Sequence, residues 1–152
     1  MRILVDTNVV LRMADKGHPM HGQALSAIEF LDSNQHECVI VPQVLYEYWV
    51  VATRPIENNG LGMTTTNTDL AISKWITLFH LLLDERDIFP IWRDLVTSND
   101  VKGKTAHDAR LIAAMQRHGV TNLLSFNKPD FIRFNAIRVF TPAEVLAGQI
   151  NV

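Results

Sequence analysis

Short runs of apolar side chains, rich in branched residues, recur along the chain and are bounded by polar or turn-forming positions. Such runs are typical of strands buried on both faces of a sheet. The four clearest are residues 2–5 (RILV), 38–41 (CVIV), 122–126 (NLLSF) and 137–140 (IRVF). A further short strand is predicted around residues 88–89, followed by a helical turn that begins at Pro90.

Between these runs, apolar positions recur at the three- and four-residue spacing of amphipathic helices. In the most regular segment, Asp108, Leu111, Ile112 and Met115 fall at i, i+3, i+4 and i+7, and Gly119 is a natural stop. The predicted helices cover residues 6–14, 42–53, 69–83 and 105–118, with a last short one beginning at Thr141–Pro142.

Two intervening stretches are less regular. Pro19 can open a helix in which Met20, Ala24, Ala27 and Leu31 share one face. Residues 55–67 contain proline, two glycines, three asparagines and a threonine run, which predicts a long loop.

Strands that alternate with helices indicate an α/β layer fold with a mainly parallel sheet. The chain shows no internal repeat, low-complexity tract or linker. We therefore expect one domain over residues 1–152.

Composition narrows the class of protein only a little. Hydrophobic residues make up 47% of the chain and charged residues 20%, as in ordinary globular proteins. The net charge of −2 gives no sign of a nucleic-acid partner, but its distribution is uneven. Residues 1–100 hold 7 basic and 13 acidic side chains, whereas residues 101–152 hold 7 and 3. The basic third suits phosphate binding, and ordinary surface charge is the alternative.

The compartment is inferred from cysteine usage and hydropathy. A single cysteine, Cys38, excludes an intrachain disulfide, and no apolar run is long enough for a signal peptide or a membrane span. We expect a cytoplasmic protein without membrane contact.

Four acidic residues fall where a parallel sheet would gather them. Asp6 directly follows the first strand, and Asp130 follows the fourth strand closely after Asn127. Glu47 lies in the second turn of the helix after the second strand, and Asp108 lies at the start of another helix. Because ligands bind at the carboxyl ends of parallel strands, these side chains are expected near one rim of the sheet.

Clustered carboxylates repel one another, and a hard divalent cation relieves that repulsion. Mg²⁺ or Mn²⁺ prefers oxygen ligands, and with bound water it can support hydrolysis of a phosphodiester. The pattern of acids is compatible with this hydrolysis but does not predict it uniquely. Taken singly, each acid has a structural alternative: Asp6 as a helix cap, Glu47 as a solvent-facing residue, Asp108 as a partner of the helix dipole and Asp130 as a turn residue.

Four segments in order resemble the motifs of PIN domains, and among them the VapC-type toxin ribonucleases. They are residues 3–11 (ILVDTNVVL), 41–47 (VPQVLYE), 107–114 (HDARLIAA) and 123–131 (LLSFNKPDF). The resemblance implies a three-layer α/β/α fold and a divalent-metal endoribonuclease, the toxin of a toxin–antitoxin pair. It implies Asp6, Glu47 and Asp108 as catalytic metal ligands. RNA as substrate, a small antitoxin partner and a homodimer are also implied.

One position departs from the family pattern, which often has an acid directly after the strand that is predicted here at residues 122–126. Asn127 stands there, so a one-metal site is favoured unless Asp130 supplies the missing ligand. Asn8 and Ser125 resemble polar residues that support the acids. Basic residues close in sequence to the motifs are candidates for substrate phosphates: Arg54, Arg110 and Lys128.

Two other functions remain open at this stage. One is a non-catalytic PIN-like module that binds RNA or protein. The other is a phosphatase with Asp6 as nucleophile, which would normally need a second aspartate two positions later, where this chain has Asn8.

Overall fold

A five-stranded, all-parallel sheet forms the centre of the computed structural model, which describes residues 1–151. The strand order is β3-β2-β1-β4-β5. The strands are β1 (Arg2–Val5), β2 (Glu37–Ile40), β3 (His80–Leu81), β4 (Asn122–Leu124) and β5 (Arg138–Phe140). The four strands predicted from apolar runs are therefore confirmed, with slightly different ends.

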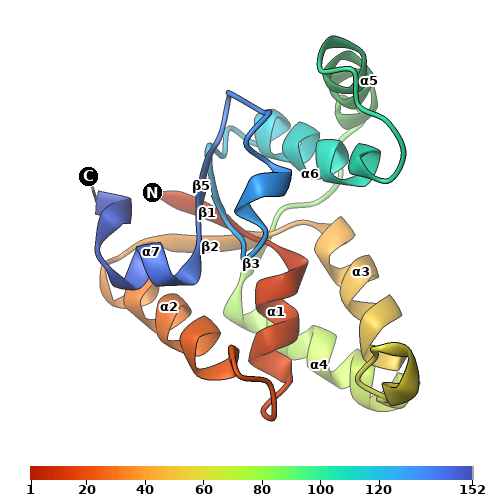
Figure 1. The fold of residues 1–152 in the computed structure, drawn as a ribbon, viewed down its shortest axis with the longest axis vertical. Coiled ribbons are helices and arrows are strands. Elements are labelled where there is room, and N and C mark those ends of the chain that lie inside the picture. The colour runs from red at the N-terminus through yellow and green to blue at the C-terminus, as the bar shows by residue number, and fades with distance from the viewer. Residues whose placement is uncertain (152) are drawn as a thin grey trace.

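Helices cover both faces of this sheet, so the predicted three-layer α/β/α fold is confirmed (Figure 1). In the view of Figure 1, α5 and α6 lie above the sheet, and α1, α2, α4 and α7 lie below it. The helices are α1 (Thr7–Ala14), α2 (His21–Ser33), α3 (Pro42–Thr53), α4 (Thr65–Leu78), α5 (Ile88–Ser98), α6 (Thr105–Arg117) and α7 (Pro142–Leu146). Within the described residues, no helix has the length and apolarity needed to cross a membrane.

The core is built around the central strand β1. Ile3, Leu4 and Val5 are fully buried, because β1 is paired on both edges and covered on both faces. This double burial explains why the strand reads as a continuous apolar run rather than an alternating one.

The strand order places a switch point between β1 and β4. From β1 the chain moves outward through β2 to β3, then returns to the other side of β1 to form β4 and β5. Connections on the two sides of such a point diverge and leave a crevice at the carboxyl ends of the strands. Asp6 follows β1 and Ser125 follows β4, so both lie at this crevice.

The helix predicted over residues 69–83 is wrong at both ends. It begins earlier, because Thr64 caps α4 by accepting a hydrogen bond from the Asn67 amide. It also ends earlier, at Leu78, and residues 80–81 form the edge strand β3 beside β2. The leucines at positions 81–83 continue the helical pattern in the sequence. Residues 80–81 form a strand because they pair with β2.

The strand predicted at residues 88–89 is also wrong, since these residues open α5. Pro90 fits into the first turn of that helix because an amide there has no partner within the helix. The predicted loop 55–67 is shorter than expected, with a 3₁₀ turn at Ile56–Asn58 and α4 beginning at Thr65. Met20, predicted to share a helix face with Ala24, Ala27 and Leu31, lies just before α2 and is 43% exposed.

Candidate metal centre

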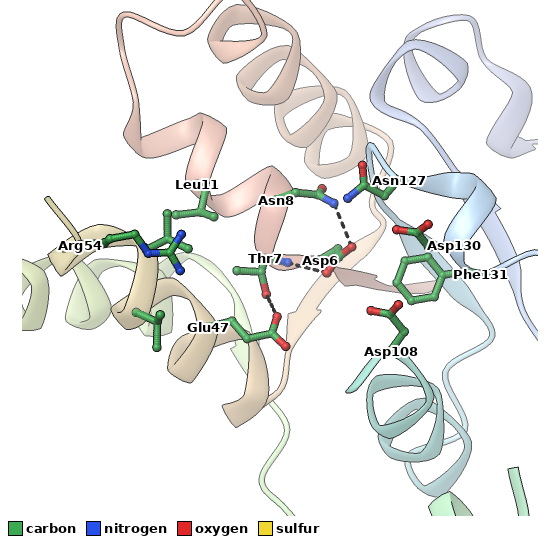
Figure 2. Close-up of a pocket in the computed structure, with 12 residues that line it drawn as sticks. Asp6, Thr7, Asn8, Leu11, Glu47, Arg54, Asp108, Asn127, Asp130 and Phe131 are labelled. Atoms are coloured by element: carbon green, nitrogen blue, oxygen red, sulfur yellow. Dashed lines mark hydrogen bonds between the residues drawn. The ribbon is translucent and has the colours of Figure 1, made fainter. Parts of the chain in front are cut away.

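Four carboxylates face one pocket of about 380 Å³ at the carboxyl ends of the strands (Figure 2). Asp6 comes from the end of β1, Glu47 from α3, and Asp108 from the first turn of α6. Asp130 comes from the 3₁₀ turn Lys128–Asp130. The structure therefore brings together all four acids that the sequence singled out, from parts of the chain up to 124 positions apart.

Asp6 is both a helix cap and a pocket residue. Its carboxylate accepts hydrogen bonds from the Thr7 amide at 2.8 Å and from the Asn8 side chain at 3.1 Å. The side chain is only 7% exposed. Capping fixes its direction, because the Thr7 amide at the start of α1 holds Oδ1 while the residue lines the pocket.

Ser125 lies behind Asp6 and orients it. The Ser125 hydroxyl donates to Asp6 Oδ2 at 2.7 Å and accepts from Asn8 Nδ2 at 3.1 Å and from the Asn127 amide at 3.0 Å. Asn8 Oδ1 in turn accepts from the Phe126 amide. These contacts join the end of β4 to the start of α1; Asn8 and Ser125 take part through their side chains and Asn127 through its backbone amide.

Glu47 is held from two sides by residues that the sequence analysis missed. The Thr7 hydroxyl donates to Glu47 Oε2 at 2.7 Å, and Gln43 Nε2 donates to Oε1 at 3.0 Å. Thr7 lies within the first motif. Gln43 precedes Glu47 by one helical turn, which is a spacing that sequence inspection could have used.

Burial and mutual repulsion make two of these acids hard to ionise. Burial raises the pKa of Asp6 to about 6, opposed by the bonds from Ser125 and Thr7 and assisted by the charges of Glu47 and Asp108. Burial likewise raises the pKa of Asp108 to about 6, with a further increase from Asp130 and Glu47. The charges of His107 and Arg133 lower the pKa of Asp108 without cancelling this increase. The pocket therefore favours a bound positive charge.

The donor set fits a hard divalent cation. The set consists of the four carboxylates, and the Asn127 side chain adds a neutral oxygen donor at the pocket wall. Among residues 1–151, no three His, Cys, Asp or Glu side chains are close enough to form a ready-made cage. Mg²⁺ suits such an open arrangement because it retains several waters and takes only one or two carboxylates directly.

The basic candidates divide into two groups. Arg54 lines the pocket beside Leu11 on the side away from Asp108 (Figure 2). Arg110 does not line it; its guanidinium donates to Gln43 and to Asp84. Lys128 also lies outside the lining and bonds Glu144 at 2.7 Å. Phosphate contacts by these basic residues remain predictions.

Comparison with known proteins places this chain in a family. The model of the PIN domain matches residues 3–137. A chain in the crystal structure of VapBC2 from Rickettsia felis bound to promoter DNA has a TM-score of 0.69 at 14% identity, covering 93% of this chain and 98% of that one. A search of curated proteins gave no match.

Two further solved structures share the fold. A toxin–antitoxin complex from Klebsiella pneumoniae has a TM-score of 0.64 at 21% identity, covering 92% of this chain and 97% of that one. VapC20 of Mycobacterium tuberculosis, described as a toxin that cleaves the sarcin–ricin loop, has a TM-score of 0.62 at 21% identity. The match covers 84% of this chain and 92% of that one.

This chain belongs to the PIN-domain family, whose members are generally nucleases. Its structural neighbours include toxin–antitoxin proteins of the VapBC type.

Proposed function

We propose that this protein is a divalent-metal-dependent endoribonuclease and the toxin of a toxin–antitoxin pair. The observation that carries the proposal is the gathering of Asp6, Glu47, Asp108 and Asp130 on one pocket at the switch point of a PIN-family sheet. Negative charge concentrated at this position would repel RNA unless a cation were bound there.

In this proposal, Asp6, Glu47 and Asp108 would hold Mg²⁺ or Mn²⁺, one or two of them directly and the others through bound water, and Asp130 would contribute from the adjoining turn. The bound cation supplies positive charge to a phosphodiester and lowers the pKa of water. Ser125 and Asn8 keep Asp6 directed at the pocket, and Thr7 does the same for Glu47.

Arg54 is the proposed contact for a neighbouring substrate phosphate. It lies on the pocket wall away from Asp108, where it adds a positive group to the pocket lining (Figure 2). A guanidinium can bind a phosphate through two parallel hydrogen bonds. Arg110 and Lys128 have carboxylate or amide partners within the protein, which gives them weaker support as phosphate ligands.

The partners are proposed by likeness to the solved relatives. One of these is described as a toxin–antitoxin complex, from Klebsiella pneumoniae, and another as VapBC2 from Rickettsia felis bound to promoter DNA. A small antitoxin that covers the acidic pocket is therefore the proposed partner, and a homodimer the proposed assembly. Such an enzyme would act in the cytoplasm, where its RNA substrate lies.

A phosphatase with Asp6 as nucleophile is less well supported. The residue at the usual acid/base position is Asn8, and its amide donates hydrogen bonds to Asp6 and Ser125. Asn8 therefore orients Asp6 and has no proton to transfer in the acid/base manner of a carboxylic acid.

The test is cleavage of a mixed RNA pool by the purified protein with Mg²⁺, with Mn²⁺ and with EDTA. Asp6→Asn is the test variant, and Asp94→Asn, at an exposed position on α5, is its matched control. We expect cutting only with metal, retained by the control and reduced at least about 100-fold in Asp6→Asn. Cutting by Asp6→Asn at the wild-type rate would contradict the proposal, and failure to cut combined with failure to bind Mn²⁺ would favour a non-catalytic binding module.

A further inference from the structure

Gln43 lies behind Glu47 and makes three hydrogen bonds to two helices. Nε2 donates to Glu47 Oε1 at 3.0 Å and to the backbone oxygen of His107 at 2.8 Å. Oε1 accepts from Arg110 Nη1 at 3.0 Å. The residue is 7% exposed, and it does not line the pocket.

The orientation of the Gln43 amide is fixed by the chemistry of its partners. A guanidinium offers only donors, so the amide oxygen must face Arg110. The carboxylate of Glu47 and the carbonyl of His107 offer only acceptors at these contacts, so both amide hydrogens must face them. Reversing the amide would break all three bonds at once.

These bonds couple the two halves of the acidic pocket. Glu47 is on α3, and His107 directly precedes Asp108 in the first turn of α6. Gln43 contacts both, and Arg110 adds a second link from α6 to the same amide. Asp84 Oδ2 pairs with Arg110 Nη2 at 3.3 Å. This ion pair holds the guanidinium that donates to the Gln43 amide oxygen.

We infer that Gln43 is a positioning residue of the metal centre, which orients Glu47 and fixes its placement relative to Asp108. It acts through Glu47 and touches neither substrate nor cation. This inference rests on the proposed metal-dependent nuclease. Residues that hold metal ligands in this way typically contribute 10- to 100-fold to metal affinity or activity.

Gln43→Met tests the inference, because methionine keeps the length and the helix preference of glutamine but cannot form the three bonds. Gln116→Met is the matched control, since Gln116 is exposed near the end of α6. We expect Gln43→Met to weaken Mn²⁺ binding by about 10- to 100-fold and to lower kcat by a similar factor. The KM for RNA should change little, and the control should behave as wild type.

Two additions separate positioning from general loss of structure. In a Glu47→Ala background, Gln43→Met should weaken Mn²⁺ binding no further, because the residue acts through Glu47. Gln43→Glu, whose carboxylate still accepts from Arg110 but cannot donate to Glu47, should show the same loss of Mn²⁺ affinity as Gln43→Met while circular dichroism reports a folded chain.

The outcomes are distinguishable from failure of the proposed function. If the wild-type protein binds Mn²⁺ and cuts RNA but folded Gln43→Met and Gln43→Glu do so equally well, the positioning role alone is overturned. The positioning role is also overturned if Gln43→Met weakens Mn²⁺ binding by the same factor in the Glu47→Ala background as it does in the wild-type protein. If the wild-type protein neither binds Mn²⁺ nor cuts RNA, the proposed function fails, and the role of Gln43 fails with it.

Discussion

At the scale of single residues, the acids of this pocket serve structure and chemistry together. Asp6 caps α1 through the Thr7 amide and also faces the pocket, so the two readings of its sequence position are compatible. Asp108 is half-buried close to other carboxylates, and its pKa is raised to about 6. A group in this state destabilises the metal-free protein when it is ionised, and a cation would reverse that effect.

The pH dependence of stability should therefore report on Asp108. Its carboxyl favours the protonated form in the folded chain, so its favourable contribution is complete below pH 3.8 and is lost as the pH rises through about 6. Asp108→Asn removes this titration. In EDTA, we expect the variant to gain unfolding free energy relative to wild type between pH 4 and pH 7, measured by urea denaturation.

The control for this measurement is again Asp94→Asn, at an exposed position on α5. A difference between Asp108→Asn and wild type that does not change with pH would contradict the assigned environment of Asp108. With Mg²⁺ present, the wild-type protein should recover stability, and the variant should recover less of it.

Sequence reasoning found the acids and named Asn8 and Ser125, which bond Asp6, but it missed Thr7 and Gln43, which bond Glu47. Asp6, Glu47, Asp108 and Asp130 follow from their places after strands and at helix starts. Gln43 was missed because its partners His107 and Arg110 lie on another helix, 64 and 67 positions away in the sequence. The placement of Arg110 was missed for a geometric reason, since residues two apart on a helix do not share a face. Nearness in sequence to Asp108 therefore did not bring its side chain to the pocket.

At the scale of elements, the segment after α3 closes the end of that helix. The amides of Leu61, Gly62 and Met63 donate to the carbonyls of Val51, Arg54 and Ala52 respectively. Carbonyls at a helix C-terminus lack partners within the helix, and the returning chain supplies them. The same returning chain fixes the backbone of Arg54, whose side chain lines the pocket.

Gly60 allows this close return. A Cβ at position 60 would overlap the Arg54 carbonyl oxygen, which belongs to the backbone and cannot easily move. We expect Gly60→Ala to lower the unfolding free energy by about 1–3 kcal/mol, as overpacking does, and to raise the KM for RNA by displacing Arg54. Urea denaturation and steady-state cleavage measure the two effects.

Gly22→Ala is the matched control, because a Cβ there meets no atom within 4 Å and alanine suits α2. Its stability should be unchanged or slightly higher. A Gly60→Ala protein as stable as wild type, with an unchanged KM, would show that neither the close approach nor the placement of Arg54 matters.

Elements with a strong local signal were predicted well, and elements chosen by tertiary contacts were not. α3 matches its predicted bounds, and α6 nearly so, because an apolar face and a clear start or stop coincide in each. The two-residue strand β3 has no such signal and exists through its pairing with Val39 and Ile40. α5 was predicted only as a helical turn that begins at Pro90, because Ile88 and Phe89 were interpreted as a strand; in the structure these two residues begin the helix and Pro90 lies within its first turn.

At the scale of the whole molecule, the sheet topology decides where the charge gathers. Reversal of the strand order between β1 and β4 opens the crevice, and the carboxylates from β1, α3, α6 and the turn after β4 meet there. The net charge of −2 gives no hint of this concentration. The fold thus converts a nearly neutral sequence into a locally acidic site.

Calorimetric titration of the purified protein with Mn²⁺ tests the central claim most directly, because it needs no knowledge of the RNA target. We predict saturable binding at pH 7 that is retained in Asp94→Asn and lost in Asp6→Asn, with the variants shown to be folded by circular dichroism. Absence of binding by the wild-type protein, or equal binding by Asp6→Asn, would contradict the assignment of these carboxylates as a metal centre.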